Sequence, residues 1–361
     1  MFMESLLEVE VTHGEEGGSG FQITLQGGRC DSRGRQDYPL LESGLLEPFN
    51  RVLMTVTIRS SPQILMDGII THHQLLPDEQ NQESSIVVTG EDVSVMMDME
   101  ERSAEHSGMD EATIARRIIS ESGYSQYGLV PEVSDPPVID APDPNERTPV
   151  QQTSDLEYLR ETARRFGYVF YITPGQSSGQ NIAYWGPPRR EDQPQRSLSV
   201  NMGPNTNVES INFRYNALSP TKVAASVQDR GSNDVNFLET SARSPSLSKR
   251  GMGEQAHVRS RRFRQPGMST SQISGRIQGM DDASSSQAAT AEGELDALCY
   301  GGLLWPHRPV ALRGAGRSYD GLWHVKQVTH VLRSGEGYKQ RFVLTREGLG
   351  TTIQKVNTER G

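Results

Sequence analysis

The alternation of apolar and polar side chains predicts a chain built mainly from β-strands. Residues 1–100 contain two such period-two runs, Phe21-Ile23-Leu25 and Val52-Met54-Val56-Ile58. A third run follows Val208, where Ile211, Phe213 and Tyr215 alternate with Asn212 and Arg214. This spacing directs one face of each segment to a core and the other to solvent, so we expect half-buried strands.

Two capping signals predict helices between the strand-rich regions. Asp110 precedes the apolar stripe of EATIARRIISES, and Ser154 stands three residues before Glu157. The second spacing is that of a capping box, in which both side chains satisfy free backbone N–H groups. That helix should stop at Gly167, and the aromatic run Tyr168–Ile172 predicts a strand directly against it.

Other regions are less regular. The proline-rich stretch 128–153 predicts an extended connector, because proline prevents helix formation there. Residues 229–290 are rich in Ser, Gly, Arg and Gln and predict a long excursion with little core of its own. We expect short helices through MMDMEER after Asp92 and through AATAEGELDAL at 288–298, followed by strands to about Thr345.

Two distant segments, 56–92 and 310–348, share an order of features. Each has a V-x-[IL]-R strand end, an Asp-Gly pair (67–68 and 320–321), a strand, a polar turn and a last strand ending in T-x-E (89–91 and 345–347). Asp-Gly between apolar runs is also a common turn signal, which is the simpler alternative. The shared order favours an internal duplication, and two similar β domains in one chain would let three chains form a ring of six similar units.

Composition limits the domain count and the chemistry. A chain of 361 residues with 35 Gly and 20 Pro should divide into two or three turn-rich domains. Cys30 and Cys299 are too few for a disulfide framework or a structural zinc site, so we expect two free thiols. The sequence also shows no signal peptide and no apolar run of membrane-spanning length, which predicts a protein made in the cytoplasm without a membrane segment.

Charge is divided unevenly along the chain. Residues 1–110 hold 20 acidic and 6 basic side chains (6 − 20 = −14), whereas residues 241–361 hold 10 acidic and 18 basic ones (18 − 10 = +8). Opposite charge at the two ends would steer copies into head-to-tail contact if those surfaces meet. The alternative is a solvated surface with no such role.

Candidate chemical residues are few, and each has a structural explanation. His72 and His73 are neighbours on a predicted strand, so they should point to opposite faces rather than bind one metal ion. We expect sheet hydrogen bonds at His324 and His330, a solvated turn at Asp281-Asp282 and a hairpin loop at 334–337. The basic cluster Arg259, Arg261, Arg262 and Arg264 could contact nucleic-acid phosphates, but an arm that neutralises an acidic neighbouring subunit is favoured. No phosphate-binding loop or nucleophile elbow is present, and we predict no catalytic, cofactor-binding or metal-binding residues.

Two segments resemble one known family. The helix–strand stretch DLEYLRETARRFGYVFYI and the closing segment YDGLWHVKQVTHVLRSGEGYKQRFVLTREGLG are similar to the phage late control D and VgrG hub proteins. The resemblance implies a mainly β fold with α+β character, in which two similar tube-type β-barrel domains accompany a peripheral α/β domain. It places the first barrel at 1–105, the α/β domain with its Pro-rich connector at 106–204, the second barrel at 205–228 and 293–350, an extended insertion at 229–292 and a C-terminal tail at 351–361.

The same resemblance implies a structural role without enzymatic activity. It describes a baseplate hub of a phage tail or contractile injection system, a homotrimer that forms a pseudo-hexameric ring and adapts a hexameric inner tube to a trimeric spike. The implied partners are the spike trimer, inner tube or tube-initiator proteins and other baseplate components, without specific nucleic-acid binding. The sequence ends at Gly361 without the OB, spike or effector domains of full-length VgrG proteins, so we expect the spike on another polypeptide. The alternatives are a baseplate-associated cell-wall hydrolase and a monomeric binding module.

Overall fold

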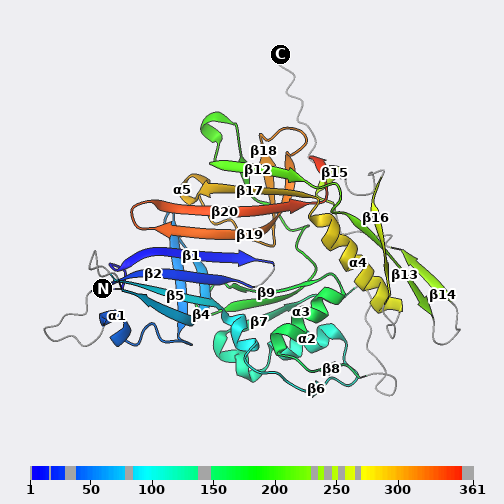
Figure 1. The fold of residues 1–361 in the computed structure, drawn as a ribbon, viewed down its shortest axis with the longest axis horizontal. Coiled ribbons are helices and arrows are strands. Elements are labelled where there is room, and N and C mark those ends of the chain that lie inside the picture. Colours follow the sequence, from blue (N-terminus) through cyan, green and yellow to red (C-terminus); the bar gives the residue numbers. More distant parts are fainter. Residues whose placement is uncertain are drawn as a thin grey trace, which may run out of the picture.

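The computed structural model describes residues 2–15, 18–28, 38–77, 84–136, 148–228, 235–239, 246–250, 257–264 and 270–351. Its centre is a large, mostly antiparallel sheet of eleven strands (Figure 1). The strands are β1 (Leu6–Gly14), β2 (Gly20–Gly28), β3 (Arg51–Ile58), β4 (Ser61–Leu76), β5 (Ser84–Asp92), β11 (Gln195–Ser199), β12 (Ser210–Tyr215), β17 (Ala289–Asp296), β18 (Pro309–Arg313), β19 (Gly321–Arg333) and β20 (Gly337–Arg346).

The two halves of this sheet have the same strand order. The N-terminal half runs β1-β2-β5-β4-β3, and the C-terminal half runs β12-β17-β20-β19 with β18 paired to β19. In both halves a first strand pairs with a second, and a three-stranded meander follows. A short helix separates the second and third strands in each, α1 (Pro39–Glu42) in one and α5 (Ala297–Tyr300) in the other.

A matching backbone turn precedes the meander in each half. Phe49 and His307 both adopt the left-handed backbone region, at φ 70° and φ 63°. The Phe49 N–H donates to the Ile70 carbonyl at 2.8 Å, and the His307 N–H donates to the Val325 carbonyl at the same distance. Ile70 and Val325 each precede a β-bulge. Left-handed backbone is uncommon at non-glycine residues, so its recurrence beside equivalent bulges relates the halves residue by residue.

The structure corrects the sequence alignment of the repeat. Asp67 lies in the middle of β4 opposite Leu53, whereas Asp320 precedes β19. Thr89 pairs with the residue after the first bulge, but Thr345 pairs with His324, the residue before Val325. The two Asp-Gly pairs and the two T-x-E ends are therefore not equivalent, although the elements that contain them are.

Each half has its own apolar core. Val11, Phe21, Leu25, Met66 and Ile86 are among the buried residues of the N-terminal core. Leu198, Leu295, Leu312, Trp323 and Phe342 are among those of the C-terminal core. The inward-facing positions alternate with outward polar ones along the strands, which is why two separate cores form on one sheet.

A separate region of helices and short strands, the helical layer, packs beside the large sheet and lies at the lower right of Figure 1. It contains α2 (Glu111–Ile119), α3 (Asp155–Arg165) and a sheet of β7 (Leu129–Val133), β10 (Asn181–Gly186) and β9 (Val169–Pro174), around a core that includes Leu159 and Trp185. Smaller elements are η1 (Val93–Met97), η2 (Ser122–Tyr127), η3 (Gly203–Asn205), β6 (Ala104–Glu105), β8 (Val150–Gln151), β15 (Ser248–Arg250) and β21 (Leu349–Thr351). No helix in the described ranges has the length and apolar character needed to cross a bilayer.

The predicted helix–strand unit at 154–172 is confirmed. Ser154 Oγ accepts the Glu157 N–H at 3.2 Å, and Gly167 ends the helix at φ 68°. Ser154 Oγ also donates to the Asp98 carboxylate, which links α3 to the segment after η1. The strand β9 follows within a few residues, as the aromatic run indicates.

Ser154→Ala is expected to lower the free energy of unfolding by about 1 kcal/mol, because it removes the N-cap acceptor of α3. Ser154→Thr, which keeps a hydroxyl, should lose much less. Urea unfolding followed by tryptophan fluorescence measures both variants. An alanine variant as stable as the parent would show that this cap is not needed.

Several sequence predictions were wrong. Residues 289–296 form strand β17 rather than a helix, because Ala289, Ala291 and Leu295 alternate inward with period two and sheet packing overrides their helix propensity. The expected helix through MMDMEER is the 3-10 turn η1, which ends at Met97. The connector at 128–153 is extended in its described residues, as predicted, but it is not only a loop, because it contains β7, which pairs with β10. Residues 137–147 lie outside the described ranges.

The excursion is also more regular than its composition indicates. It holds β14 (Val235–Glu239), β16 (Arg259–Phe263) and the 17-residue helix α4 (Thr270–Ser286). Both strands pair with β13 (Thr221–Gln228), so the assignment of residues 221–228 to the second barrel is wrong. These elements form an arm at the right of Figure 1. A small core that includes Val223 and Ile277 joins the helix to the strands, so the expectation of little core holds but that of little structure does not.

Candidate functional site

Several strand edges of the large sheet are unpaired in the described part of the chain, and they include the outer edges of β3 and β11, the free side of β12 and the end of β4. β12 pairs only with β17 and forms one end of the strand order. At the other end, β3 covers β4 only as far as Ile69, so residues 72–76 of β4 pair with β5 alone. Unpaired backbone N–H and C=O groups along a strand are a template for pairing with another strand.

Large apolar side chains are exposed beside the edges of β4 and β12. Near β4, Leu45 is 61% exposed, Phe49 60% and Leu76 43%. Near β12, Leu218 is 61% exposed and Tyr215 38%. Single exposed apolar residues are common on protein surfaces, but apolar residues grouped along an open strand edge indicate an interaction surface.

Inside the chain, an edge of the same kind on β19 is already paired with another strand, β1. β18 covers β19 only as far as His324, and β1 pairs with the remainder of that strand, from Gln327 to Arg333. Thr12 and Thr329 lie side by side with their hydroxyl oxygens 3.0 Å apart. The Arg333 side chain donates to Glu8 at 2.8 Å. This internal joint connects the two halves of the sheet, and its ion pair joins an acidic N-terminal residue to a basic C-terminal one.

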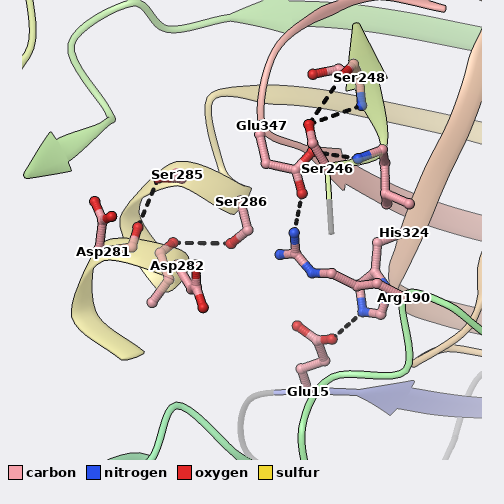
Figure 2. Close-up of polar contacts among 12 residues, drawn as sticks. Glu15, Arg190, Ser246, Ser248, Asp281, Asp282, Ser285, Ser286, His324 and Glu347 are labelled. Carbon is pink, nitrogen blue, oxygen red and sulfur yellow. Dashed lines mark hydrogen bonds and ion pairs between the residues drawn. The ribbon is translucent and has the colours of Figure 1, made fainter. Parts of the chain in front are cut away.

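A buried polar cluster lies at one end of the internal joint. Glu15, the residue after β1, contacts His324 Nε2 and has a side-chain oxygen 3.8 Å from His307 Nδ1 (Figure 2 shows Glu15 facing His324). The His307 ring stacks on Tyr171 of β9, with ring centroids 3.6 Å apart. The cluster therefore fastens β1 to the C-terminal half of the sheet and to the helical layer.

Burial controls protonation in and beside this cluster. Burial lowers the pKa of His13 to about 4, although the Leu65 carbonyl oxygen accepts a hydrogen bond from its ring at 2.9 Å. Burial also lowers the pKa of His307 and, strongly, that of His330. Burial opposes ionisation of Glu15, but the hydrogen bond with His324 and the nearby His307 ring outweigh it and hold the Glu15 pKa well below its ordinary range. Burial therefore favours the neutral forms of His13, His307 and His330, whereas Glu15 stays ionised.

Sequence reasoning located part of this cluster but not its role. His324 and His330 do lie on β19, yet their side chains contact Glu15 and the Tyr338 hydroxyl rather than the backbone of the sheet. Glu15 and His307 were missed, because neither stands in a motif. No group of three or more potential ligands in the described ranges could hold a metal ion. His72 is exposed and His73 is half-buried against the Leu46 carbonyl, which places them on opposite sides of β4.

The other predicted residues have mixed outcomes. Asp281 is fully buried on α4, so the expected solvated turn is wrong there. Arg259, Arg261 and Arg262 lie exposed on β16, and the acidic neighbour proposed for them stays a prediction. The 334–337 turn is a hairpin loop in which Arg333 pairs with Gly337. Cys299 is a free, exposed thiol, and Cys30 lies outside the described residues.

A cavity of about 420 Å³ lies between β9 and the His307 segment. Its lining includes Glu132, whose carboxylate contacts Arg189 at 2.5 Å, and the Arg189 guanidinium lies 4.2 Å from the centre of the Tyr184 ring. A hydrolase of the glycosidase type needs two carboxylates that face each other across a cleft. The described lining has Glu132 as its one carboxylate, and that group is engaged by an arginine.

No protein-family model matches the chain, and no curated protein matches it by sequence. Solved structures do match along nearly its whole length. A tail protein from Neisseria meningitidis MC58 has a TM-score of 0.63 at 12% identity and covers 96% of this chain and 93% of its own. The 43 kDa tail protein of prophage MuSo2 from Shewanella oneidensis has a TM-score of 0.64 at 13% identity, with coverages of 95% and 94%. The chain has the phage tail-protein fold.

A component of a secretion system also has a similar fold. An E. coli component of the type VI secretion system, described as structurally similar to the T4 tail proteins gp27 and gp5, has a TM-score of 0.57 at 13% identity. The match covers 95% of this chain and 73% of that one. At these identities the likeness shows the fold alone, and it confirms the baseplate hub-like resemblance of the two sequence segments at that level.

Proposed function

We propose that the chain is the structural hub of a phage tail or contractile injection apparatus, and that three copies form a pseudo-hexameric ring. In this ring each copy contributes two similar units to the six positions of an inner tube, while the threefold arrangement of the chains matches a trimeric spike. The mechanism is mechanical: closed strand pairing around an axis makes a rigid adaptor between two symmetries.

The matching strand order of the two halves of the large sheet carries this proposal. A chain with one unit would need six copies to meet a hexameric tube, whereas a chain with two equivalent units needs three. The recurrence of the left-handed turn at Phe49 and His307 supports an equivalence of units and not merely of strand counts. The fold shared with tail proteins supports the setting in which such an adaptor works.

We further propose the domain limits that the sequence indicates, without residues 221–228, so that tube-type barrels lie at 1–105 and at 205–220 with 293–350. The two apolar cores support a division into two units, but the C-terminal core also includes Leu198 of β11 and Ala289 of β17, which lie outside these limits. Apart from β11 and the start of β17, which belong to the large sheet, the α/β layer at 106–204, the insertion at 229–292 and the tail at 351–361 would lie outside the ring wall. Spike, tube and other baseplate proteins are the proposed partners, consistent with the tail and secretion proteins that share the fold.

Electron microscopy of purified particles labelled on this chain tests the proposal. The expected result is a label at the junction of inner tube and spike. A label at another part of the particle, or a chain found on no particle, would contradict a hub. Hydrolysis of peptidoglycan by the purified chain would favour the cell-wall hydrolase instead.

A further inference from the structure

The open edges of β12 and β4 have the same places in their halves as the edges of β1 and β19 that pair inside the chain. We propose that β12 of one copy pairs with residues 72–76 of β4 in the next, in the register in which β1 pairs with β19 inside the chain. This inference rests on the proposed ring and specifies its joint residue by residue.

The β-bulges define which residues of β4 and β19 are equivalent. Ile70 and Val325 precede the bulges and accept the hydrogen bond of the left-handed residue in each half. Counting onward from these two positions makes residues 72–76 equivalent to 327–331. Residues 327–331 lie within the part of β19 that β1 covers, and residues 72–76 are the part of β4 that is open.

Following the paired residues across the sheet, strand by strand, shows which residues of the first strands, β1 and β12, are equivalent. In the N-terminal half the row from Ile70 runs through Gly90 and Phe21 to Val11. In the C-terminal half the row from Val325 runs through Leu344 and Ala291 to Phe213. Val11 on β1 is therefore equivalent to Phe213 on β12, and both rows are read from strand pairing alone.

The register of the joint between copies follows from the joint inside the chain. Val11 pairs with His330, five residues after Val325, so Phe213 should pair with Leu75, five residues after Ile70. Phe213 and Leu75 are both half-buried and both pack against the core of their own half, so the register places inward side chains together. A shift of the register by one residue would place the core-facing side chains of one strand opposite the solvent-facing side chains of the other.

In the joint between copies, apolar residues have the places that polar residues have at one end of the internal joint. Glu15 follows β1 and contacts His307, and the residues equivalent to this pair are Ala217 and Phe49. Phe49 is 60% exposed and Leu218, next to Ala217, is 61% exposed. Pairing the edges brings these two side chains into the same region, where each can cover the other. Their exposure in a single chain is thereby explained.

A double-cysteine variant tests the register. Thr12 and Thr329, whose hydroxyl oxygens are 3.0 Å apart, are equivalent to Arg214 and Gln74, which are both exposed in one chain. Directly paired residues on antiparallel strands have Cα atoms about 4.5–5.5 Å apart, within the range that a disulfide spans. We expect Gln74→Cys with Arg214→Cys to give a covalent trimer on mild oxidation, in a chain whose Cys30 and Cys299 are replaced by serine.

The matched control pairs Gln74→Cys with Ser210→Cys, on the same face of β12 but four residues away, or about 13 Å along the strand. It should give little covalent product. Sedimentation of the same samples without oxidation reports their assembly state. Equal cross-linking of both pairs, or an assembled trimer that cross-links at neither, would overturn the register and leave the hub to be judged by particle labelling. A chain that stays monomeric and uncross-linked at its highest soluble concentration would overturn the joint itself.

Discussion

Phe49→Asp is expected to abolish ring assembly while leaving the single chain folded. Phe49 is held in a left-handed turn beside the open edge of β4, and most of its side chain is exposed in one chain. A carboxylate in its place would have to lose its water on contact with Leu218 of the next copy, without a partner there. Truncating a central aromatic residue of an interface commonly costs about 2 kcal/mol or more, which is about thirtyfold in affinity.

Because a closed ring contains the same joint three times, the loss in Phe49→Asp should multiply and leave monomer under conditions where the parent is trimeric. Sedimentation of the two proteins side by side measures this. Phe237→Asp is the matched control, since Phe237 is 79% exposed on β14 of the arm, away from both open edges. Equal loss of trimer in both variants, or an intact trimer with Phe49→Asp, would contradict the proposed joint.

Acidification is expected to destabilise the folded chain beginning near pH 6.5. His13 has a pKa of about 4 when folded and about 6.5 when unfolded, so between these values the unfolded chain binds more protons. Stability from His13 is complete above about pH 6.5 and is lost progressively down to about pH 4, a loss of roughly 3 kcal/mol. His307 and His330 act in the same direction because burial lowers their pKa values too, and Glu15 adds a further loss below about pH 4.5.

His13→Gln removes one of these titrating groups while keeping a side chain that can donate to the Leu65 carbonyl. Urea unfolding at pH 7.5 and at pH 5 should show a smaller difference between the two conditions for this variant than for the parent. His72→Gln is the control for replacement of a histidine by glutamine, because His72 is exposed on β4 and far from the buried cluster in sequence. An unaltered pH dependence in His13→Gln would show that this histidine is not kept neutral by burial.

Local signals predicted the elements whose ends are fixed by a single side chain. Ser154 and Asp110 both cap the helices expected of them, since a cap acts within three residues and needs no tertiary information. β12 followed from its alternation in the same way. The duplicated arrangement was also visible from the sequence, although the residues first matched between the repeats are not equivalent in strand pairing.

The features that the sequence did not predict depend on contacts between residues that are distant in the chain. The Ala- and Glu-rich segment of β17 reads as a helix until its neighbours β12 and β20 are known. The cluster of Glu15 with His307 and His324 joins residues about three hundred positions apart, which no spacing rule connects. The open edges are likewise invisible in a linear pattern, because an unpaired strand and a paired one have the same alternation.

A reconstruction of the assembled chain by electron cryomicroscopy without imposed symmetry tests the central claim most directly. The account predicts a closed ring of three chains in which two kinds of joint alternate, one between β1 and β19 of the same chain and one between β12 and β4 of adjacent chains. The two joints should superpose, with Phe213 opposite Leu75 where Val11 lies opposite His330. A ring with another number of chains, or chains that meet through other surfaces while β12 and β4 stay open to solvent, would contradict it.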